Sequence, residues 1–319
     1  MKVVITDLDM VSIENETKVF QQAGISFALK QLHTEEELIE GCRDADILLV
    51  QYVKITRRVM EALPQVKLIV RYGVGVDSVD LTAATEYGIQ VCNVPDYGVN
   101  EVAGHAVALA LSLVRKIDLL NRRTKTERWD YSACIPIHRF SAMTVGVVGL
   151  GRIGRNFAQK MSALGFHVFG YDPFYRETPE TKEYIEEVSF DDLISCADIV
   201  SLHCPADGNE KIMNLDVFKK MKNSAILINV ARGTLVSDED LDAALQEGEI
   251  AAAGLDTVSI EPAPADYFLF RHDNLLVTPH MAWYSEEAGH ELQRKVAEEA
   301  VLFATGKEIR YPVNRLGSR

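Results

Sequence analysis

The sequence has 319 residues, 47% of them hydrophobic and 25% charged, which is an ordinary globular composition and enough chain for two domains. Its formal net charge of −14 repels phosphate backbones and argues against nucleic acid as a direct partner. Five scattered cysteines without a CxxC pair predict free thiols rather than a disulfide framework or a metal site. The longest nearly uncharged run, 102–114, is shorter than a membrane span, and residues 1–10 turn acidic too early for a signal peptide. We therefore expect a soluble, cytoplasmic protein.

Short apolar runs of strand length alternate with helical patterns along the chain, which is typical of parallel sheets in an α/β protein. In the first hundred residues the predicted strands are 3–6, 47–50, 68–71 and 90–94. The predicted helices between them are 14–23, 35–41 and 56–63. This series predicts one modest doubly wound sheet.

A second series begins at Thr144 and indicates a larger sheet of the dinucleotide-binding type. Its six predicted strands are 145–149, 167–171, 199–202, 225–230, 252–256 and 275–278. An Ala- and Leu-rich helix predicted at 98–115 is apolar on most faces, so it must be buried, either between domains or between subunits. A final helix at 285–305 is too short to fold alone and is expected to pack back on the first domain.

The glycine-rich turn after the first strand of the second series carries the most specific signal. Gly149-x-Gly151-x-x-Gly154 follows a strand-like run and precedes an amphipathic segment at 155–164. Gly149 permits a tight turn, Gly151 lets the backbone approach a pyrophosphate, and Gly154 permits close packing of helix on strand. The helix N-terminus offers amide donors to the anion, so this context predicts a dinucleotide site.

Asp172 stands at the end of the next predicted strand, where an acid accepts hydrogen bonds from both ribose hydroxyls of NAD. A carboxylate at this place would repel the 2′-phosphate of NADP, so NAD is the predicted cofactor. Arg176 lies close enough in the sequence to leave the degree of that preference open.

Nearly the whole chain resembles the D-isomer-specific 2-hydroxyacid dehydrogenases. The motifs that carry the resemblance are VRYGVGVDSVDL (70–81), GLGRIG (149–154), NVARGTLV (229–236), GLDTVSIEP (254–262) and TPH (278–280). The resemblance implies two doubly wound parallel-sheet domains, a flavodoxin-like substrate domain and a Rossmann NAD-binding domain. We assign 1–97 and 286–319 to the substrate-binding domain and 98–285 to the NAD-binding domain, through which a homodimer is expected.

Three matched residues, Arg232, Glu261 and His280, correspond to the family's catalytic residues. Reduction of a 2-oxo acid needs a hydride and a proton, and His280 would deliver the proton because imidazole titrates near neutral pH. Glu261 would hydrogen-bond the other ring nitrogen, raise the pKa of the histidine and fix its orientation. Arg232 would pair with the substrate carboxylate through two parallel hydrogen bonds.

The resemblance also implies further contacts to substrate and cofactor. Backbone amides near Val74 and Gly75 would bind the substrate carboxylate, because glycine permits a close approach. Asp256 would contact the nicotinamide carboxamide. The remaining predicted cofactor contacts are Arg152, Ile153, Cys204, Pro205, Val230 and Ala231.

The identity of the substrate stays open, because the residues after His280 depart from the small ones common in the family. The segment AWYSE (282–286) resembles the C-terminal binding proteins, NAD(H)-responsive corepressors of the same fold, so an interaction protein is an alternative to an enzyme. Trp283 either lines the substrate pocket or seals the domain hinge. A 3-phosphoglycerate dehydrogenase is a further alternative, weakened because 49–56 offers Gln51 and Tyr52 where that branch places basic side chains.

Overall fold

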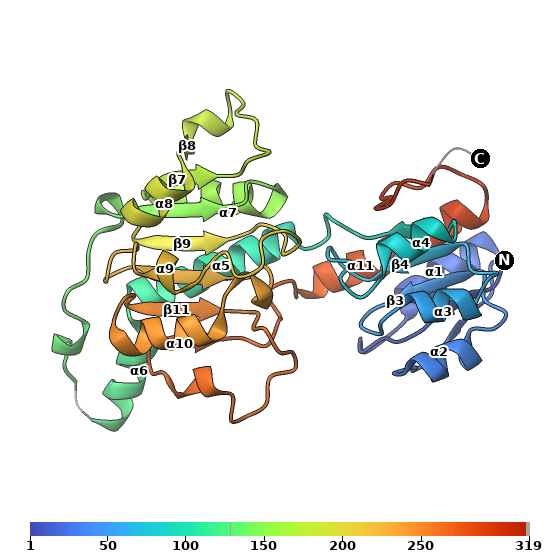
Figure 1. Cartoon of the computed structure of the whole chain (residues 1–319), viewed down its shortest axis with the longest axis horizontal. Helices are drawn as coiled ribbons and strands as arrows, with labels where there is room; N and C mark the ends of the chain where they lie inside the picture. Colours follow the sequence, from blue (N-terminus) through green and yellow to red (C-terminus); the bar gives the residue numbers. More distant parts are fainter. Residues whose placement is uncertain (128, 317–319) are drawn as a thin grey trace. The chain divides into compact units, whose positions relative to one another are not determined.

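The computed structural model describes residues 1–127 and 129–316. It divides the chain into two compact units, which are described separately below (Figure 1). Unit 1 comprises Met1–Gly98 and Ser285–Arg319, and unit 2 comprises Val99–Tyr284. The predicted domain boundaries, after residues 97 and 285, each differ by one residue from the boundaries of the two units. Residues 317–319 of the predicted substrate-binding domain lie outside the described residues. The substrate-binding role assigned to unit 1 stays a prediction.

Unit 1 is built on a five-stranded parallel sheet of order β2-β1-β3-β4-β5, the flavodoxin-like order. Its strands are β1 Val3–Ile5, β2 Phe27–Leu29, β3 Ile47–Val50, β4 Leu68–Arg71 and β5 Gln90–Cys92. The prediction of four strands missed β2. This strand lies at the sheet edge, is only partly buried and consists of three apolar residues, a run too short to stand out in the sequence.

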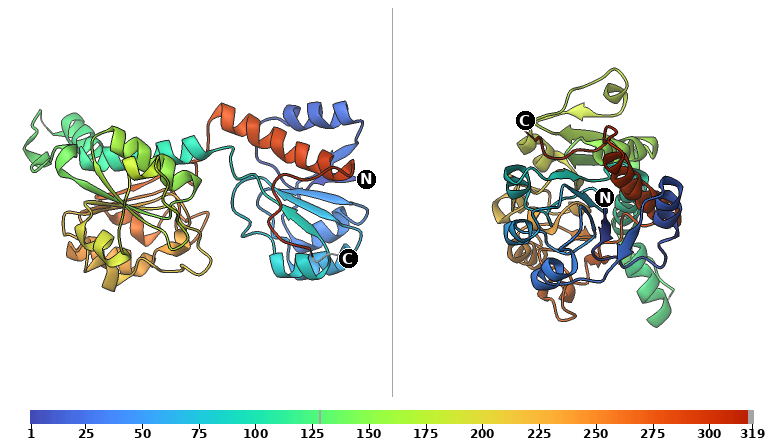
Figure 2. Two further views of the ribbon diagram at one scale, coloured as in Figure 1. Left: turned by 90° about the horizontal axis from the view of Figure 1, so that it is seen from above. Right: turned by 90° about the vertical axis from the view of Figure 1, so that its right-hand side faces the viewer.

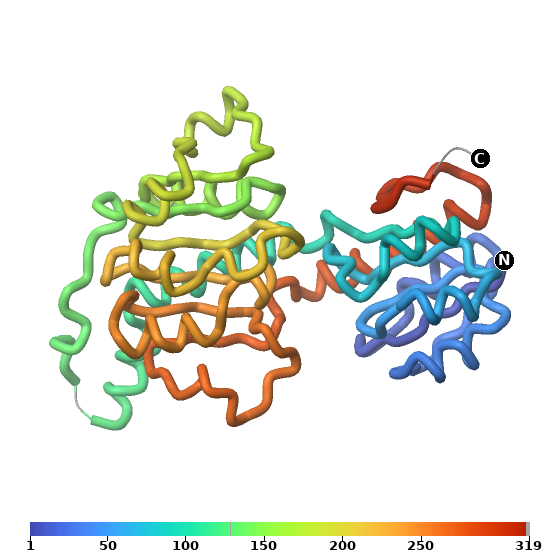
Figure 3. Tube along the Cα trace, viewed as in Figure 1, coloured from blue at the N-terminus to red at the C-terminus, as the bar shows by residue number. Residues whose placement is uncertain are grey.

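Helices cover both faces of this sheet. The helices α1 Glu14–Ala23 and α11 Glu286–Ala304 pack side by side, and α11 also contacts β3 and β4 (Figure 2). On the other face lie α2 Glu35–Gly41, α3 Arg57–Ala62 and the unpredicted α4 Leu81–Glu86. Figure 3 follows the chain from residues 1–98 in unit 1, through unit 2, and back to α11 in unit 1.

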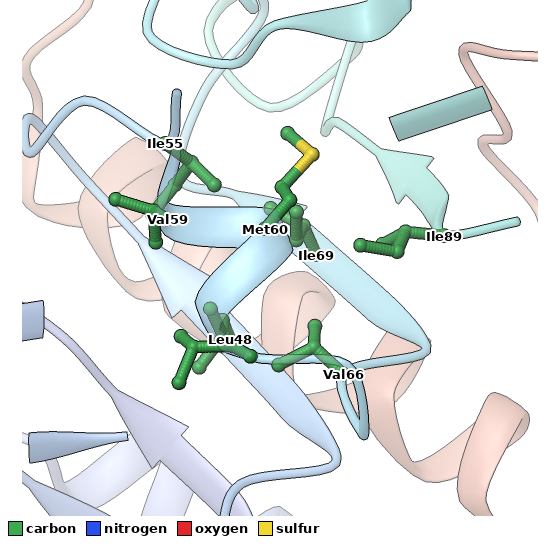
Figure 4. Close-up of a pocket in the computed structure, with 8 residues that line it drawn as sticks. Leu48, Ile55, Val59, Met60, Val66, Ile69 and Ile89 are labelled. Carbon is green, nitrogen blue, oxygen red and sulfur yellow. The ribbon is translucent and has the colours of Figure 1, made fainter. Parts of the chain in front are cut away.

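The core below α3 is entirely apolar. Figure 4 shows Met60 and Val59 of α3 over Leu48 and Ile69 of the sheet, and the space among these side chains is too small for a water molecule. This part of unit 1 therefore supplies packing and offers no ligand pocket.

The long C-terminal helix α11 begins and ends with the signals that its sequence carries. The Ser285 hydroxyl accepts from the Ala288 N–H at 3.0 Å, which caps the helix start. Gly306 follows its end at a φ of 70°, a left-handed conformation that glycine adopts without strain.

Unit 2 is built on a seven-stranded parallel sheet of order β12-β11-β10-β9-β6-β7-β8. Its strands are β6 Thr144–Val148, β7 His167–Tyr171, β8 Glu186–Glu187, β9 Ile199–Leu202, β10 Ile226–Asn229, β11 Ala252–Leu255 and β12 Leu275–Val277. The strand order reverses between β6 and β9, as in the dinucleotide-binding fold. The prediction of six strands missed β8, an edge strand of two glutamates that carries no hydrophobic signal.

Helices also cover both faces of the second sheet (Figures 1 and 2). One face carries α5 Val99–Val114 and α7 Arg152–Ala163, and the other carries α8 Phe190–Cys196, α9 Leu215–Phe218 and α10 Asp238–Glu247. The buried alanines Ala103, Ala106 and Ala110 let one face of α5 approach β10, β11 and α7 closely. The predicted position of this helix between domains or between subunits stays a prediction. The other helical segments of unit 2 are α6 Ile117–Thr126 and the 3₁₀ turns Ser132–Cys134, Phe140–Ala142, Thr181–Glu183, Gly233–Leu235 and Phe268–Arg271.

Within residues 1–127 and 129–316, no helix has both the length and the apolar character that a membrane crossing requires.

Unit 1 buries a carboxyl group beside the end of β4. Glu16 of α1 is fully buried, and its Oε1 accepts from the Tyr72 hydroxyl at 2.9 Å, while Oε2 has no hydrogen-bond partner among the described residues. Burial raises the pKa of Glu16 above its usual 4.5, because the low-dielectric interior disfavours the charged form.

Replacing Glu16 with Gln should therefore change stability in a pH-dependent way. A carboxyl with a raised folded pKa contributes stability that is complete below its unfolded pKa of about 4.5 and is lost as pH rises through the folded value. The unfolding free energy of the Glu16→Gln variant should thus increase relative to that of the wild type as the pH rises. Urea unfolding monitored by amide exchange in α1 and β4 measures this difference. Glu14→Gln, at an exposed position on the same helix, is the matched control. The prediction would be contradicted if the difference in unfolding free energy between variant and wild type were independent of pH for Glu16→Gln, as it should be for Glu14→Gln.

Candidate active site

The predicted site residues of unit 2 follow the carboxyl ends of parallel strands, so their segments leave the sheet at one edge. This edge is where open α/β sheets bind ligands. The strands and the residues that follow them are β6 with Gly149, β7 with Asp172, β9 with Cys204 and Pro205, β10 with Val230, Ala231 and Arg232, β11 with Asp256, and β12 with His280.

The three glycines of the turn between β6 and α7 differ in what requires them. Gly149 has a φ of 94°, and a Cβ there would lie 2.5 Å from the Cys204 nitrogen, so the turn packs directly on the end of β9. A Cβ on Gly154 would lie 1.9 Å from the Gly149 oxygen. Gly151 has an ordinary φ of −67° and no atom within 4 Å of such a Cβ. The packing of the chain therefore explains two glycines, while the third leaves open space above the helix start, as an approaching pyrophosphate needs.

The start of α7 is suited to bind an anion. No described side chain caps it, so the first amides, including those of Arg152 and Ile153, point out of the helix end. Asp172 is tied to the same turn, since its carboxylate accepts from the Leu150 N–H and from the Phe174 N–H, each at 2.8 Å. These two bonds hold the acid beside the glycine turn and leave lone pairs for further donors.

Two side chains near this turn have chemistry that bears on the cofactor prediction. Burial raises the pKa of the Cys204 thiol to about 11, so it is neutral at physiological pH. Arg176 is the basic residue whose position in the sequence left the degree of preference for NAD over NADP open. Its guanidinium donates from Nη1 to the Tyr175 carbonyl at 2.7 Å.

His280 and Glu261 form a close hydrogen-bonded pair in the site. His280 Nδ1 lies 2.5 Å from Glu261 Oε2, and the Val258 N–H donates to Glu261 Oε1 at 3.1 Å. An ionised carboxylate only accepts, so Nδ1 carries the proton and Nε2 is left to gain or lose one. No described group hydrogen-bonds Nε2. The pair can thus store a proton at Nε2 and release it.

The backbone of His280 has an unusual conformation that its surroundings maintain. Its φ of 52° is left-handed, which costs a residue with a Cβ about 1–2 kcal/mol. The His280 N–H donates to the Asp256 carbonyl at 2.8 Å. The buried Asp256 carboxylate accepts from the Met281 and Ala282 N–H groups at 3.0 and 2.9 Å. Asp256 therefore holds the loop of His280, and its predicted contact with nicotinamide stays a prediction.

The segment of Arg232 is held by a buried amide and by a close backbone approach. Asn229, fully buried at the end of β10, donates to the Arg232 carbonyl at 2.8 Å and accepts from the Ala231 N–H at 3.1 Å. A Cβ on Gly233 would lie 1.9 Å from the Val258 carbonyl oxygen, so the arginine turn packs on the loop that carries Glu261.

A second buried acid, Asp238 of α10, organises the loop of Glu261. Its Oδ2 accepts from the Ser259 N–H at 3.1 Å, from the Ser259 hydroxyl at 2.6 Å and from the Tyr267 hydroxyl. The structure thus links the loops of Arg232, Glu261 and His280 within unit 2.

The other predicted substrate contacts are placed as follows. Val74 and Gly75 lie in unit 1 on the loop after β4, where the Asn93 side chain donates to the Val74 carbonyl at 2.6 Å. Trp283 lies in unit 2, with its ring 5.5 Å from that of Tyr284 in an edge-to-face arrangement. Neither observation tests their contact with substrate, which stays a prediction.

Sequence reasoning missed the polar residues that support this site. Asn229 and Asp238 are buried, and Thr278 donates to Asp256 Oδ1 at 2.6 Å. A polar residue at the end of an apolar run is a visible signal for Asn229, whose partners lie in its own turn. The partners of Asp238 and Thr278 lie in other segments of the chain. Among residues 1–127 and 129–316, no group of three or more His, Cys, Asp or Glu side chains is arranged to hold a metal ion.

Comparison with known proteins identifies the family of this site. Residues 107–282 match the model of the NAD-binding domain of the D-isomer-specific 2-hydroxyacid dehydrogenases. This match covers more than half of the chain and includes every predicted cofactor residue, together with Arg232, Glu261 and His280. NAD is the cofactor of this domain, and the described turn, helix start and acid fit it.

Relatives agree with this assignment. A D-3-phosphoglycerate dehydrogenase of Methanocaldococcus jannaschii is 36% identical over 98% of this chain and 59% of its own length. The chain spans little more than half the length of the first curated relatives it matches. The NAD complex of a D-isomer-specific 2-hydroxyacid dehydrogenase from Lactobacillus delbrueckii superimposes with a TM-score of 0.83 at 27% identity, covering 98% of this chain and 100% of that one. The D-lactate dehydrogenase of Lactobacillus jensenii with NAD⁺ gives 0.80 at 30% identity, covering 99% and 100%.

Replacing Asp172 with Asn should reduce discrimination between NADH and NADPH. The amide keeps an acceptor for the Leu150 N–H but removes the charge that binds ribose hydroxyls and repels a 2′-phosphate. Since a hydrogen bond to a charged group contributes about 1.5–3 kcal/mol, the ratio of the two dissociation constants should narrow about 10- to 100-fold. Fluorescence titration with each nucleotide measures both constants. Glu177→Gln, an exposed acid after the same strand, is the control, and an unchanged ratio in Asp172→Asn would refute the assignment.

Proposed function

The chain belongs to the D-isomer-specific 2-hydroxyacid dehydrogenases, a family of NAD-dependent oxidoreductases, and from this premise we propose that it reduces a small 2-oxo acid with NADH. The observation that carries the proposal is the contact of His280 Nδ1 with Glu261 Oε2 at 2.5 Å, on the sheet edge that also carries the glycine turn and Arg232. When bound, NADH supplies the hydride, and the protein must supply the proton and the position of the substrate.

The side chains divide this work according to their chemistry. His280 holds a proton at Nε2 and delivers it to the carbonyl oxygen of the substrate. Glu261 accepts the hydrogen bond from the Nδ1–H group, which orients the ring and stabilises the imidazolium. Arg232 pairs with the substrate carboxylate and orients the carbonyl. In the reverse direction neutral His280 takes the hydroxyl proton.

We propose an unphosphorylated substrate first. On the loop after β3 in unit 1, Gln51 Nε2 donates to Asp9 Oδ1 at 2.5 Å, and the Tyr52 hydroxyl donates to Asp9 Oδ2 at 3.1 Å. These side chains are committed to an acid, which is an unfavourable environment for a phosphate. A 3-phosphoglycerate dehydrogenase is the second candidate, because the relatives at 34–36% identity bear that name.

Two further parts of the proposal concern assembly and role. A homodimer through unit 2 is supported by large apolar side chains exposed between α5 and β6, with exposed fractions of 56% for Ile117, 93% for Trp129 and 63% for Ile135. The alternative of an NAD(H)-sensing interaction protein, suggested by the AWYSE segment, stays a hypothesis, as does a cytoplasmic location.

Catalysis should depend on His280 and Glu261 in different ways. His280→Ala removes the proton donor, so kcat should fall by about 10²–10⁴-fold while NADH affinity is kept. Glu261→Gln should lower kcat by a smaller factor, because the amide oxygen can still accept from Nδ1–H but no longer balances the charge of the imidazolium. Steady-state rates of NADH oxidation with 2-oxo acids give both results. Exposed His290→Ala is the control, and a full rate in His280→Ala would exclude the mechanism.

The role of Trp283 should appear in the dependence of rate on substrate length. If its ring covers the substrate side chain, each buried methylene should add about 0.8 kcal/mol, roughly fourfold in kcat/KM, and Trp283→Ala should flatten this dependence. A homologous series of straight-chain 2-oxo acids, assayed in wild type and variant, measures the slope. Parallel slopes would exclude Trp283 from substrate selection. A phosphorylated 2-oxo acid in the same assay tests the second candidate function, a 3-phosphoglycerate dehydrogenase. That function requires a higher kcat/KM for the phosphorylated acid than for every acid of the series.

A further inference from the structure

A polar chain of hydrogen bonds connects α5 with the loop of His280. His105 interrupts an otherwise apolar stretch of α5, and its Nε2 lies 2.9 Å from the Thr278 hydroxyl oxygen. Thr278 Oγ1 in turn lies 2.6 Å from Asp256 Oδ1, the carboxylate that holds the Met281 and Ala282 amides. His105 and Asp256 are 19% and 1% exposed, so solvent does little to replace these bonds.

The direction of each hydrogen bond follows from the groups present. An ionised carboxylate only accepts, so the single hydroxyl proton of Thr278 is donated to Asp256. The Thr278 oxygen must then accept from its other neighbour, which makes His105 Nε2 the donor and defines the tautomer of a neutral His105. The distance of 3.7 Å between His105 Nε2 and Asp256 Oδ1 adds an attraction whenever the imidazole is charged.

The end of this chain bears directly on His280. The left-handed backbone of His280 lies between Thr278 and Met281, and both of these residues hydrogen-bond Asp256 Oδ1. Rotation of the Asp256 carboxylate would release these bonds together, and the imidazole would lose its alignment with Glu261. Apart from Asp256 itself, the described side chain that hydrogen-bonds the Thr278 hydroxyl is that of His105.

We propose that His105 is a positioning residue for the acid–base pair: by donating from Nε2 to Thr278, it fixes the Asp256 carboxylate and thereby the orientation of His280 toward Glu261. The proposal rests on the proposed function for its effect on rate, but its structural part concerns hydrogen bonds alone. His105 itself acts through Thr278 and Asp256 and transfers no proton to the substrate.

Two substitutions of His105 separate donation from packing. Glutamine places an amide N–H close to the position of Nε2 and should retain the donor, whereas leucine of similar size cannot donate. His105→Leu should lower kcat about 10- to 100-fold, because misplacement of a reacting group by about 1 Å has an effect of that order. The KM for NADH should stay within about twofold of wild type, and His105→Gln should recover most of kcat. Ser112→Ala, a polar substitution on the same helix, is the matched control.

A double-mutant cycle tests whether the effect passes through Thr278. Thr278→Val removes the hydroxyl from the other side of the same bond, and it also serves if His105→Leu does not fold. The double variant should lose no more rate than the more damaging single variant, because residues that act through one interaction are not additive. Additive losses would show that His105 acts by another route and would overturn the proposal.

Side-chain ¹⁵N spectra give a readout that does not depend on turnover. In wild type and in His105→Gln, neutral His280 should be the Nδ1–H tautomer held by Glu261, and in His105→Leu a mixture of tautomers should appear. The proposal would be overturned by an unchanged His280 spectrum in His105→Leu. It would also be overturned if this variant raised the KM for NADH and left kcat unchanged. A wild-type protein that reduces no 2-oxo acid but shows the predicted tautomers would instead refute the proposed function and leave the positioning role supported.

Discussion

The pairing of parallel strands in unit 2 is the constraint on which the site depends. Strands β9, β10, β11 and β12 are paired so that Leu202, Asn229, Leu255 and Val277 end level with one another. The chain segments that leave these strands therefore start side by side, although they are separated by more than twenty residues in sequence. Rigid strands fix the starting points of functional loops more accurately than loops could by themselves.

Level strand ends create a second requirement, because the backbone N–H groups just beyond a sheet have no ladder partner. In this protein buried polar side chains satisfy them. Asn229, Asp238 and Asp256 each accept from one or two backbone N–H groups of the loops that carry Arg232, Glu261 and His280. The same bonds that satisfy the backbone fix the reactive side chains, so stability and function of this edge have one physical origin.

The reactive groups themselves remain accessible. The side chains of His280 and Glu261 are 45% and 33% exposed, whereas the acids that support their loops are buried. Exposure leaves His280 Nε2 open to a substrate, and burial keeps the supporting bonds strong, since a hydrogen bond to a charge is stronger where water is excluded. His280 keeps a left-handed backbone because several such bonds act on its loop at once.

The sequence by itself determined the α/β class, most strands and the glycine turn with Asp172, and its resemblance to a family predicted Arg232, Glu261 and His280. The first three features depend on local properties: apolar runs of strand length, the conformations that glycine permits, and residue types at short fixed spacing. Edge strand β2 was missed because its apolar run has only three residues, and edge strand β8 because its two glutamates carry no apolar signal. Only the tertiary structure decided which polar groups meet. Thr278 lies 22 residues from Asp256 and 173 from His105, and Glu16 lies 56 residues from Tyr72. No sequence pattern links such partners, because a hydrogen bond depends on where the fold places two groups and not on their separation along the chain.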